Sequence, residues 1–397
     1  MKPVEIAKGI YDVGVIDWNI RDFHGYSTHL GTTYNAFLIV DEKIALIDTV
    51  KRGFEGQMLR NIDTIVDPAK IDLVISNHAE MDHSGSLPAV LEKIGKDTPV
   101  YCSKMGRKNL SRHFRGEINY QVVPDGETLS LGKRSLTFLE TRMLHWPDSM
   151  FTYVNEDKIL ISSDAFGQHY AGQEEFADML GDEVTHHAKK YFANILLPYA
   201  PLIHKLIGRI REMGLEIDMI CPDHGVLWRD PAPIIEAYEQ WASQEDLQEK
   251  AVIVYDTMWE STHQMALAVA DGLHREGVKV RPMRLRKWDR SDILTEVLDA
   301  KAVIFGSPTL NNNMFPTLSD FITYLRGLRP QNRIGAAFGS FGWGGEAVKH
   351  LERDLEAMKF TIPEPGLKIQ YVPDGDGIAN CVDFGRRLAR AIQGRED

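Results

Sequence analysis

A short apolar strand that leads directly into four potential metal ligands sets the first limit on the architecture of this chain. Residues 71–76 (Ile-Asp-Leu-Val-Ile-Ser) are mostly apolar or β-branched, which predicts a buried strand, and the turn-forming residues 84–86 (Ser-Gly-Ser) lie shortly beyond it. Between them, four side chains of ligand type occur within six residues: His78, Glu80, Asp82 and His83. A strand end can direct several side chains at one point, so the segment predicts a metal-binding loop. For this segment alone, the alternative is a polar surface turn.

Three later residues of ligand type each close an apolar or strand-like run. These residues, with the runs that they close, are His145 (136–145), Asp164 (159–164) and His224 (219–224). A single histidine after a strand is more often structural. Four strand ends that carry such groups predict one convergent metal site.

The length and composition are those of a globular protein with more than one domain. At 397 residues, 43% of them hydrophobic and 26% charged, the chain is too long for one ordinary core, and two domains are expected. The first ten residues contain no apolar signal core, and no later stretch offers about 18 uncharged apolar residues in a row. We therefore expect a cytoplasmic protein that does not associate with a membrane.

The cysteine content and the charge distribution exclude several kinds of site and partner. The three cysteines are scattered without CxxC spacing, so histidine and carboxylate, rather than thiolate, must hold any metal. The net charge is -12. Residues 251–397 contain 19 Lys+Arg and 19 Asp+Glu, which leaves 26 and 38 for residues 1–250. This excess of acid argues against a nucleic-acid surface in the first part of the chain.

The first part of the chain alternates short strands with turns, the pattern of a β-sheet layer. Besides the runs named above, strands are predicted at residues 9–16, 32–40, 43–48 and 99–102, and helices at residues 54–65 and 105–114.

The order of the predicted elements changes after a polar segment at residues 242–249. We therefore place a domain boundary there, which gives domains at 1–249 and 250–397. Strands are predicted at 251–256, 278–280, 302–306, 334–339 and 367–372, and helices at 262–276, 291–300, 317–328, 345–359 and 378–393. Five strand–helix pairs in succession predict a doubly wound parallel sheet.

Three loops after strands of the second domain have the features of a flavin mononucleotide (FMN) site. Residues 257–262 (Thr-Met-Trp-Glu-Ser-Thr) resemble the phosphate loop of flavodoxins, with Trp259 at a position where that loop has a hydroxyl residue. The expected FMN-binding residues are Thr257, Met258, Trp259, Ser261, Thr262, Ser307, Pro308, Thr309, Asn311, Asn312, Ser340, Phe341, Gly342, Trp343 and Gly344. Trp259 and Trp343 are candidates to stack on the flavin ring, and ordinary packing is the alternative for each of them.

The ligand pattern resembles that of the metallo-β-lactamase superfamily, whose hydrolases carry an H-x-H-x-D-H loop and later His, Asp and His ligands. Here Glu80 replaces the second histidine, and in this respect the chain resembles the flavodiiron proteins. The resemblance implies an α/β and α+β fold: an N-terminal metallo-β-lactamase-like αββα sandwich followed by a C-terminal flavodoxin-like doubly wound parallel sheet.

The resemblance also implies a diiron centre and a residue-by-residue assignment of its ligands. It assigns His78, Glu80 and His145 to one iron, Asp82, His83 and His224 to the other, and Asp164 to a bridge between them. Water can displace the residue equivalent to His83 in this family. Imidazole and carboxylate donors suit iron or manganese and leave positions open for a small ligand. The resemblance further favours His24 as a donor beside the ligands, whereas Tyr191 is equally compatible with core packing.

The function implied by the resemblance is the four-electron reduction of dioxygen to water, the reduction of nitric oxide to nitrous oxide, or both. Electrons would pass from an external donor to FMN and then to the diiron centre. No four-cysteine rubredoxin module follows the second domain, so we expect a separate rubredoxin-like donor, with a reduced deazaflavin coenzyme as the alternative. The family implies a head-to-tail homodimer or a dimer of dimers. The preference between the two gases stays open.

A dense basic run in the second domain comprises Arg281, Arg284, Arg286, Lys287 and Arg290. A solvated surface is the default interpretation of such a run. The sharper hypothesis is a docking patch for a small acidic electron donor.

Two other classes of protein are compatible with parts of the pattern. A zinc hydrolase of the metallo-β-lactamase type, fused to a flavodoxin-like domain, would explain the fold, but Glu80 argues against it. An electron carrier with a structural front domain would leave buried carboxylates and imidazoles without a metal, which is unfavourable.

Overall fold

The computed structural model describes residues 2–395 and divides the chain into two compact units. The division along the chain falls between Glu239 and Gln240, inside α7 (Ala232–Ser243), and the second unit also includes Gly25–Ser27 and Ala193–Pro198. The boundary predicted at residue 249 lies inside β17 (Gln248–Tyr255).

The first unit contains two mixed β-sheets. The first sheet has the spatial order β1 (Val4–Ala7), β2 (Ile10–Asp12), β7 (Phe37–Val40), β8 (Ile44–Ile47), β9 (Leu73–Ser76), β10 (Val100–Cys102) and β11 (Tyr120–Val122). The second has the order β12 (Thr128–Ser130), β13 (Ser135–Glu140), β14 (Met150–Val154), β15 (Ile159–Ile161) and β16 (Met219–Cys221). The remaining short strands of the first unit are β3 (Val15–Asp17), β4 (Asp22–Phe23) and β6 (Thr32–Tyr34), whereas β5 (Tyr26–Ser27) is assigned to the second unit.

The two sheets share a buried apolar core. Phe37 and Ile75 of the first sheet and Phe138 and Ile161 of the second belong to one cluster, and each side chain is at most 1% exposed. Alternation along β13 places Leu136 and Phe138 in this cluster, as expected for a strand with one face in a sandwich core.

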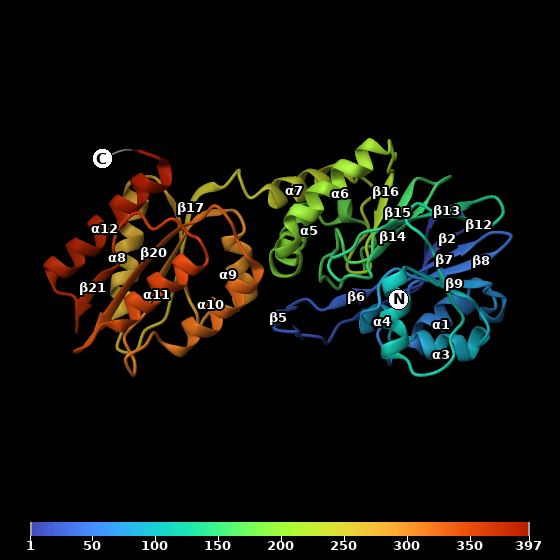
Figure 1. The fold of residues 1–397 in the computed structure, drawn as a ribbon, viewed down its shortest axis with the longest axis horizontal. Coiled ribbons are helices and arrows are strands. Elements are labelled where there is room, and N and C mark those ends of the chain that lie inside the picture. The colour runs from blue at the N-terminus through green and yellow to red at the C-terminus, as the bar shows by residue number, and fades with distance from the viewer. Residues whose placement is uncertain (1, 396–397) are drawn as a thin grey trace. The chain divides into compact units, whose positions relative to one another are not determined.

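Helices cover the sandwich from outside. Leu91 and Leu110 bury their side chains in a second cluster beneath the first sheet's helices, which lie together in Figure 1. The helices of this part of the chain are α1 (Glu55–Asp63), α2 (Met81–Ser84), α3 (Leu87–Ile94), α4 (Lys104–His113), α5 (Asp182–Tyr191) and α6 (Ala200–Glu212). Arg209 of α6 donates hydrogen bonds to Asp125, next to the second sheet. The expected αββα sandwich is confirmed.

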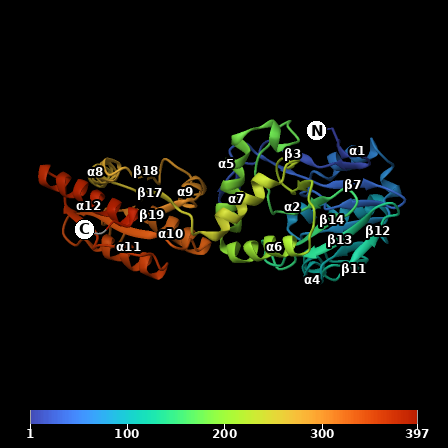
Figure 2. The same ribbon diagram turned by 90° about the horizontal axis from the view of Figure 1, so that it is seen from above.

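The second unit is a doubly wound parallel sheet with helices on both faces (Figure 2). Its strand order is β18 (Lys279–Arg284), β17, β19 (Ala300–Gly306), β20 (Ile334–Phe341) and β21 (Leu367–Gln370), the flavodoxin-like order 2-1-3-4-5. The helices between and after them are α8 (Ser261–Arg275), α9 (Arg290–Val297), α10 (Pro316–Leu328), α11 (Glu346–Ala357) and α12 (Gly375–Gln393). Met265 of α8 and Phe384 of α12 share one core cluster with Ile253 of β17, so these two helices cover the same face.

Candidate functional site

The seven predicted ligand residues meet at one end of the sandwich. His78 follows β9, and the predicted ligand loop contains one helical turn, α2, which carries Asp82 and His83 and has Glu80 at its N-cap. Asp164 and His224 follow β15 and β16. His145 was predicted to close a strand, but β13 ends at Glu140, and His145 lies in a turn that has hydrogen bonds from Leu144 N to Thr141 O and from Met143 N to Trp146 O.

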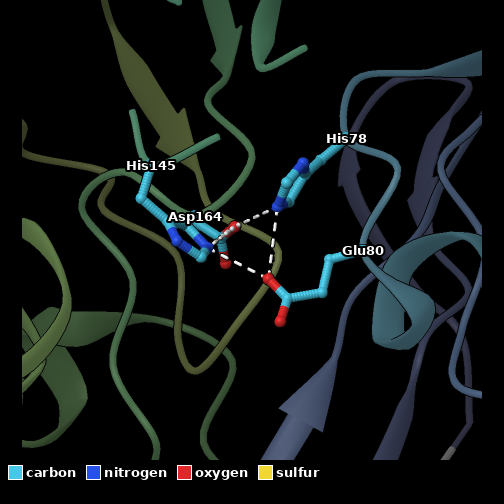
Figure 3. Close-up of side chains that lie close together, drawn as sticks. All are labelled: His78, Glu80, His145 and Asp164. Carbon is cyan, nitrogen blue, oxygen red and sulfur yellow. Dashed lines mark hydrogen bonds and ion pairs between the residues drawn. The ribbon is translucent and has the colours of Figure 1, made fainter. Parts of the chain in front are cut away.

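The first ligand group comprises His78, Glu80, His145 and Asp164, whose side chains point at one another in Figure 3. Glu80 Oε2 lies 3.3 Å from His78 Nε2 and 3.0 Å from His145 Nε2. Asp164 Oδ2 lies 3.3 Å and 3.2 Å from the same two nitrogens. One ligand atom of each residue lies within 4.8 Å of the others, the arrangement expected around one metal ion.

The second ligand group comprises Asp82, His83 and His224. His224 Nε2 lies 3.1 Å from Asp82 Oδ2, and His83 Nε2 lies 3.4 Å from Asp82 Oδ1. Asp164 Oδ1 lies 3.3 Å from His83 Nε2 and 3.6 Å from His224 Nε2. Because Asp164 turns one oxygen to each group, it occupies the position of a bridging carboxylate.

The buried polar atoms of this site have the environment of metal ligands. Within residues 2–395, Asp82 Oδ1, His83 Nε2 and Asp164 Oδ2 are buried and have no hydrogen-bond partner. Such atoms are unfavourable unless a cation completes them, so the residues present fit a pair of metal ions.

The pKa values of the ligand histidines also indicate that the site favours bound positive charge. Burial lowers the pKa of His145, but the adjacent carboxylates of Asp164 and Glu80 outweigh it and raise its pKa to about 9. Burial also lowers the pKa of His83, yet the charges of Asp82 and Asp164 raise its pKa well above the usual 6.5. Without a metal, protons on these imidazoles balance the carboxylates, and metal binding would displace them.

Asp148 orients His78 from outside the ligand groups. Its Oδ2 accepts hydrogen bonds from His78 Nδ1 (3.0 Å) and Ala79 N (2.7 Å), and its Oδ1 accepts one from Asn109 Nδ2 (2.7 Å). The hydrogen bond from His78 Nδ1 leaves Nε2 free to face Glu80 and Asp164. The sequence signal for Asp148 is the Trp-Pro-Asp that follows His145, but its partner lies 70 residues away.

A backbone carbonyl orients the His224 ring, and a glycine follows His224 in the chain. Its Nδ1 donates to Thr33 O at 2.7 Å, so its Nε2 faces Asp82. Gly225 has φ +79°, and a Cβ atom there would collide with Gln168 Oε1. His169, which the sequence reasoning missed, is buried beside His224, with its Nδ1 2.8 Å from Thr32 Oγ1.

The two residues predicted beside the ligands differ in environment. Tyr191 is 1% exposed, and its hydroxyl donates to Asp164 Oδ1 at 2.6 Å, so it contacts the site as well as the core. Burial, followed by the charge of Asp164, raises its pKa well above 10, which keeps the hydroxyl protonated. The His24 side chain is 80% exposed, and its Nε2 lies 3.9 Å from Glu80 Oε1.

A cavity of about 560 Å³ leads from the surface to the ligand groups. It is lined by Ile20, Asp22, Phe23, His24, Lys51, Glu80, Met81, Asp82 and Trp146. A small gas molecule can therefore reach two of the carboxylate ligands from outside.

A second cavity, of about 670 Å³, lies at the carboxyl ends of the parallel strands in the second unit. It is lined by Met258, Trp259, Ser261, Pro308, Thr309, Asn311, Asn312, Ser340, Phe341, Gly342, Trp343, Gly344, Tyr371 and Val372. Twelve of these fourteen residues were predicted, and Tyr371 and Val372, which follow the fifth strand, were missed. Trp259 and Trp343 are 88% and 86% exposed, so they stand at the rim of the cavity and do not pack in the core.

The other three predicted flavin residues lie beneath the cavity. Thr262 Oγ1 lies 2.9 Å from Ser340 Oγ, and Ser307 Oγ accepts a hydrogen bond from Phe315 N at 2.8 Å. Thr257 Oγ1 is buried and has no partner within the described residues. A phosphate at the N-terminus of α8 could accept a hydrogen bond from the Thr257 hydroxyl, so the loop fits an FMN phosphate.

The basic run predicted as a docking patch is largely neutralised. Arg286 donates to the buried Asp256 carboxylate and to Thr257 O, at the base of the phosphate loop. Arg284 pairs with Glu260, Arg281 with Glu296 and Arg290 with Asp320. Of the five cations in the run, four therefore have a carboxylate partner within the second unit.

Within the described part of the chain, no helix is both long and apolar enough to cross a membrane.

Comparisons with known proteins match the two units separately and together. A sequence model described as "ODP family beta lactamase" matches residues 32–225, and one described as "Flavodoxin" matches residues 253–385. A protein named nitric oxide reductase from Moorella thermoacetica is 48% identical to this chain, over 98% of this chain and 99% of its own length.

Two solved structures resemble the whole chain. Rubredoxin oxygen:oxidoreductase from Desulfovibrio gigas has 43% identity and a TM-score of 0.97, with 99% of each chain covered. The flavodiiron protein from Giardia intestinalis has 34% identity and a TM-score of 0.96, with 99% of this chain and 97% of that chain covered. Identity of this extent along the full length, together with two facing ligand groups and a flavodoxin-like unit in one chain, establishes that this chain belongs to the flavodiiron protein family.

Proposed function

We propose that this protein reduces dioxygen to water, nitric oxide to nitrous oxide, or both, with electrons that pass from an external donor through FMN to a diiron centre. The observation that carries the proposal is Asp164, whose two carboxylate oxygens face two separate ligand groups in a chain that also has a flavodoxin-like unit. Glu80 in place of a second histidine favours iron over the zinc of the related hydrolases.

The residues that hold the metals are assigned from the two groups. His78, Glu80 and His145 would hold one iron, Asp82, His83 and His224 the other, and Asp164 would bridge them. When bound, the two irons and FMN supply the electron storage and transfer that the reaction requires. The protein supplies the positions of the ligands, the access of the gas and the delivery of protons.

Proton delivery falls to residues of this chain, because four-electron reduction of dioxygen to two waters consumes four protons. The cavity that reaches Glu80 has at its mouth the exposed imidazole of His24, between solvent and the Glu80 carboxylate. Tyr191 stays protonated and holds Asp164 Oδ1 by a hydrogen bond, which fixes the orientation of the bridging carboxylate.

FMN binding falls to the three loops of the second unit. Thr257 and Ser261, near the N-terminus of α8, would hold the phosphate, and the loops after β19 and β20 would hold the flavin ring. Trp259 and Trp343, at the rim of the cavity, would be available to stack on it.

The proposal also covers the electron donor, the cellular compartment and the oligomeric state. A rubredoxin-like protein is the proposed donor, with a reduced deazaflavin coenzyme as the alternative, and the proposed compartment is the cytoplasm. We further propose a head-to-tail homodimer, alone or as a dimer of dimers. In it the FMN of one subunit faces the diiron centre of the other. The exposed Trp259 and Trp343 at the FMN cavity support a surface that a second subunit covers.

The first test is gas consumption by protein loaded with iron and FMN and reduced anaerobically, with dioxygen and nitric oxide supplied in separate runs at matched concentrations. Rapid turnover of either gas is expected, and the faster one is the preferred substrate. Asp164→Asn should abolish turnover and retain FMN. If the iron-loaded protein consumes neither gas and the zinc-loaded protein hydrolyses an ester or thioester, the hydrolase alternative replaces this proposal.

A further inference from the structure

Helix α4 carries a stripe of positive charge that the proposed function does not use. Lys104, Arg107, Lys108, Arg112 and, just beyond the helix, Arg115 are all exposed. Within the helix, Lys104, Lys108 and Arg112 follow one another at intervals of four residues, and Arg107 is three residues from Lys104, so these four lie along one face. Residues 104–116 contain no aspartate or glutamate, although the chain as a whole has a net charge of -12.

The charges on α4 are not neutralised by the protein itself. Within residues 2–395, none of these five side chains forms an ion pair, in contrast to the run at residues 281–290, where each arginine has a carboxylate partner. The stability of the helix does not explain the stripe either. Cations are favourable in the last turn, where Arg112 lies, but Lys104 and Arg107 lie in the first turn, where the helix dipole disfavours them.

The helix that carries the stripe contacts, through other residues, the surroundings of the metal ligands. Asn109 of α4 donates to Asp148, which in turn accepts from His78. The ring of His113, at the end of the helix, stacks on Trp146 with centroids 6.4 Å apart, and Trp146 lines the cavity together with Glu80. A molecule bound to the exposed face of α4 would therefore contact a helix whose other side packs beside the metal site.

We propose that the exposed face of α4 is the docking surface for a small acidic electron-carrier protein. This inference rests on the proposed function, because it assumes an external protein donor that reduces FMN and a head-to-tail homodimer in which the FMN of the partner subunit faces the diiron centre of the unit that carries α4. Unpaired cations on a rigid helix attract an acidic carrier at long range and raise its association rate.

The helix itself argues against other anionic partners. A membrane-surface helix needs a free apolar face, but Leu110 of α4 is 0% exposed and packs in the core. An extended nucleic acid would meet the acidic surface of a unit with a large excess of Asp and Glu. A compact acidic protein requires only the local stripe.

The test compares two triple variants of the FMN- and iron-loaded protein with the unchanged protein. Arg107→Gln, Lys108→Gln and Arg112→Gln together remove three charges from α4 and keep good helix formers in place. The matched control combines Lys8→Gln, Lys43→Gln and Lys133→Gln, which also remove three exposed positive charges. These lysines lie in turns of the sandwich at the end opposite the metal ligands; Lys43, for example, directly precedes β8.

The measurement is the second-order rate constant for anaerobic reduction of the bound FMN by reduced rubredoxin, followed by flavin absorbance over a range of ionic strength. We expect the α4 variant to lose about tenfold in rate at low salt and to show a flatter salt dependence, while the control stays within about twofold. Equal rates for the two variants would overturn the docking surface.

Two further measurements separate the other outcomes. Reduction of FMN by dithionite, a small reductant, should be the same in all three proteins, and the dithionite-reduced protein should still consume gas. Failure of gas consumption with intact FMN reduction would refute the proposed function and leave the docking result standing. If the α4 variant instead loses binding to phosphatidylserine vesicles or to duplex DNA with an unchanged rubredoxin rate, α4 serves that anion and not an electron carrier.

Discussion

Substitutions of Asp148 can show whether a residue that does not bind the metal controls how well the protein retains iron. Asp148→Ala removes the acceptor for His78 Nδ1 and Ala79 N, so the imidazole loses its orientation, and we expect iron content to fall about tenfold or more under mild chelation. Asp148→Asn should retain most of the iron, because its amide oxygen can accept both hydrogen bonds while its NH2 group donates to the flipped Asn109 amide. The measurement is iron per chain, with FMN per chain as the control.

The two substitutions separate position from charge at His78. If Asp148→Asn loses as much iron as Asp148→Ala, the negative charge matters more than the orientation. Asn109→Ala, which removes only the outer hydrogen bond, should have a smaller effect than either.

The partly buried Glu175 and the buried Asp12 form an acid pair that makes stability depend on pH. Burial, followed by the charge of Asp12, raises the pKa of Glu175 to about 9, and burial raises the pKa of Asp12 to about 6. The ordinary glutamate pKa is 4.5, so the folded protein keeps a proton that the unfolded chain releases. The free energy of unfolding should therefore fall as pH rises from about 5 to 9, by at most about 1.4 kcal/mol per pH unit per proton.

Glu175→Gln should flatten this decrease, because an amide does not titrate. The check is chemical unfolding of both proteins between pH 6 and pH 9, and the variant should gain relative to the unchanged protein at the alkaline end. Parallel stability profiles for the two proteins would contradict the acid pair as the cause.

At the scale of elements, short sequence patterns predict most strands and helices, but they do not predict contacts between segments that are far apart in the chain. The run before His78 and the five strand–helix pairs of the second unit are periodic within short windows, which is why they can be recognised. Asp148 meets His78 across 70 residues and Thr33 meets His224 across 191, and no short window contains both partners. Tyr371 lies after a short edge strand with no loop motif of its own.

The loop after β17 depends on an ion pair between the half-exposed Arg286 and the buried Asp256, which the basic run in the sequence does not reveal. Arg286 joins the Asp256 carboxylate, which is 0% exposed, to the carbonyl of Thr257. Arg286→Gln leaves Asp256 less compensated beside an anionic phosphate, so we expect FMN affinity to fall about tenfold, on the order of 1.4 kcal/mol. Flavin fluorescence on release measures the dissociation constant.

Arg281→Gln is the matched control for this prediction. Arg281→Gln also removes one positive charge, from β18, which ends just before the turn that carries Arg286, but the partner of Arg281 is Glu296. A loss of FMN affinity equal to that of Arg286→Gln would mean that general charge, and not the tie to Thr257, holds the loop.

At the scale of the whole molecule, each unit has an apolar core of its own. The cluster that contains Ile253 and Phe384 draws only on the second unit, and the clusters that contain Leu110 and Phe138 draw only on the first. Two cores in one chain predict that each cofactor stabilises the unit that binds it, because a ligand stabilises the folded form to which it binds.

Calorimetry on protein stripped of iron and FMN should therefore show two transitions with different responses. Added FMN should raise only the transition of the second unit, and ferrous iron under anaerobic conditions only that of the first, each by about 2.7 kcal/mol at a free concentration of 100 times the dissociation constant. Asp164→Asn should remove the response to iron and keep the response to FMN, and Arg286→Gln should do the reverse in part. A single transition that both ligands raise alike would mean that the two cores unfold together, so that loss of either cofactor weakens the whole chain.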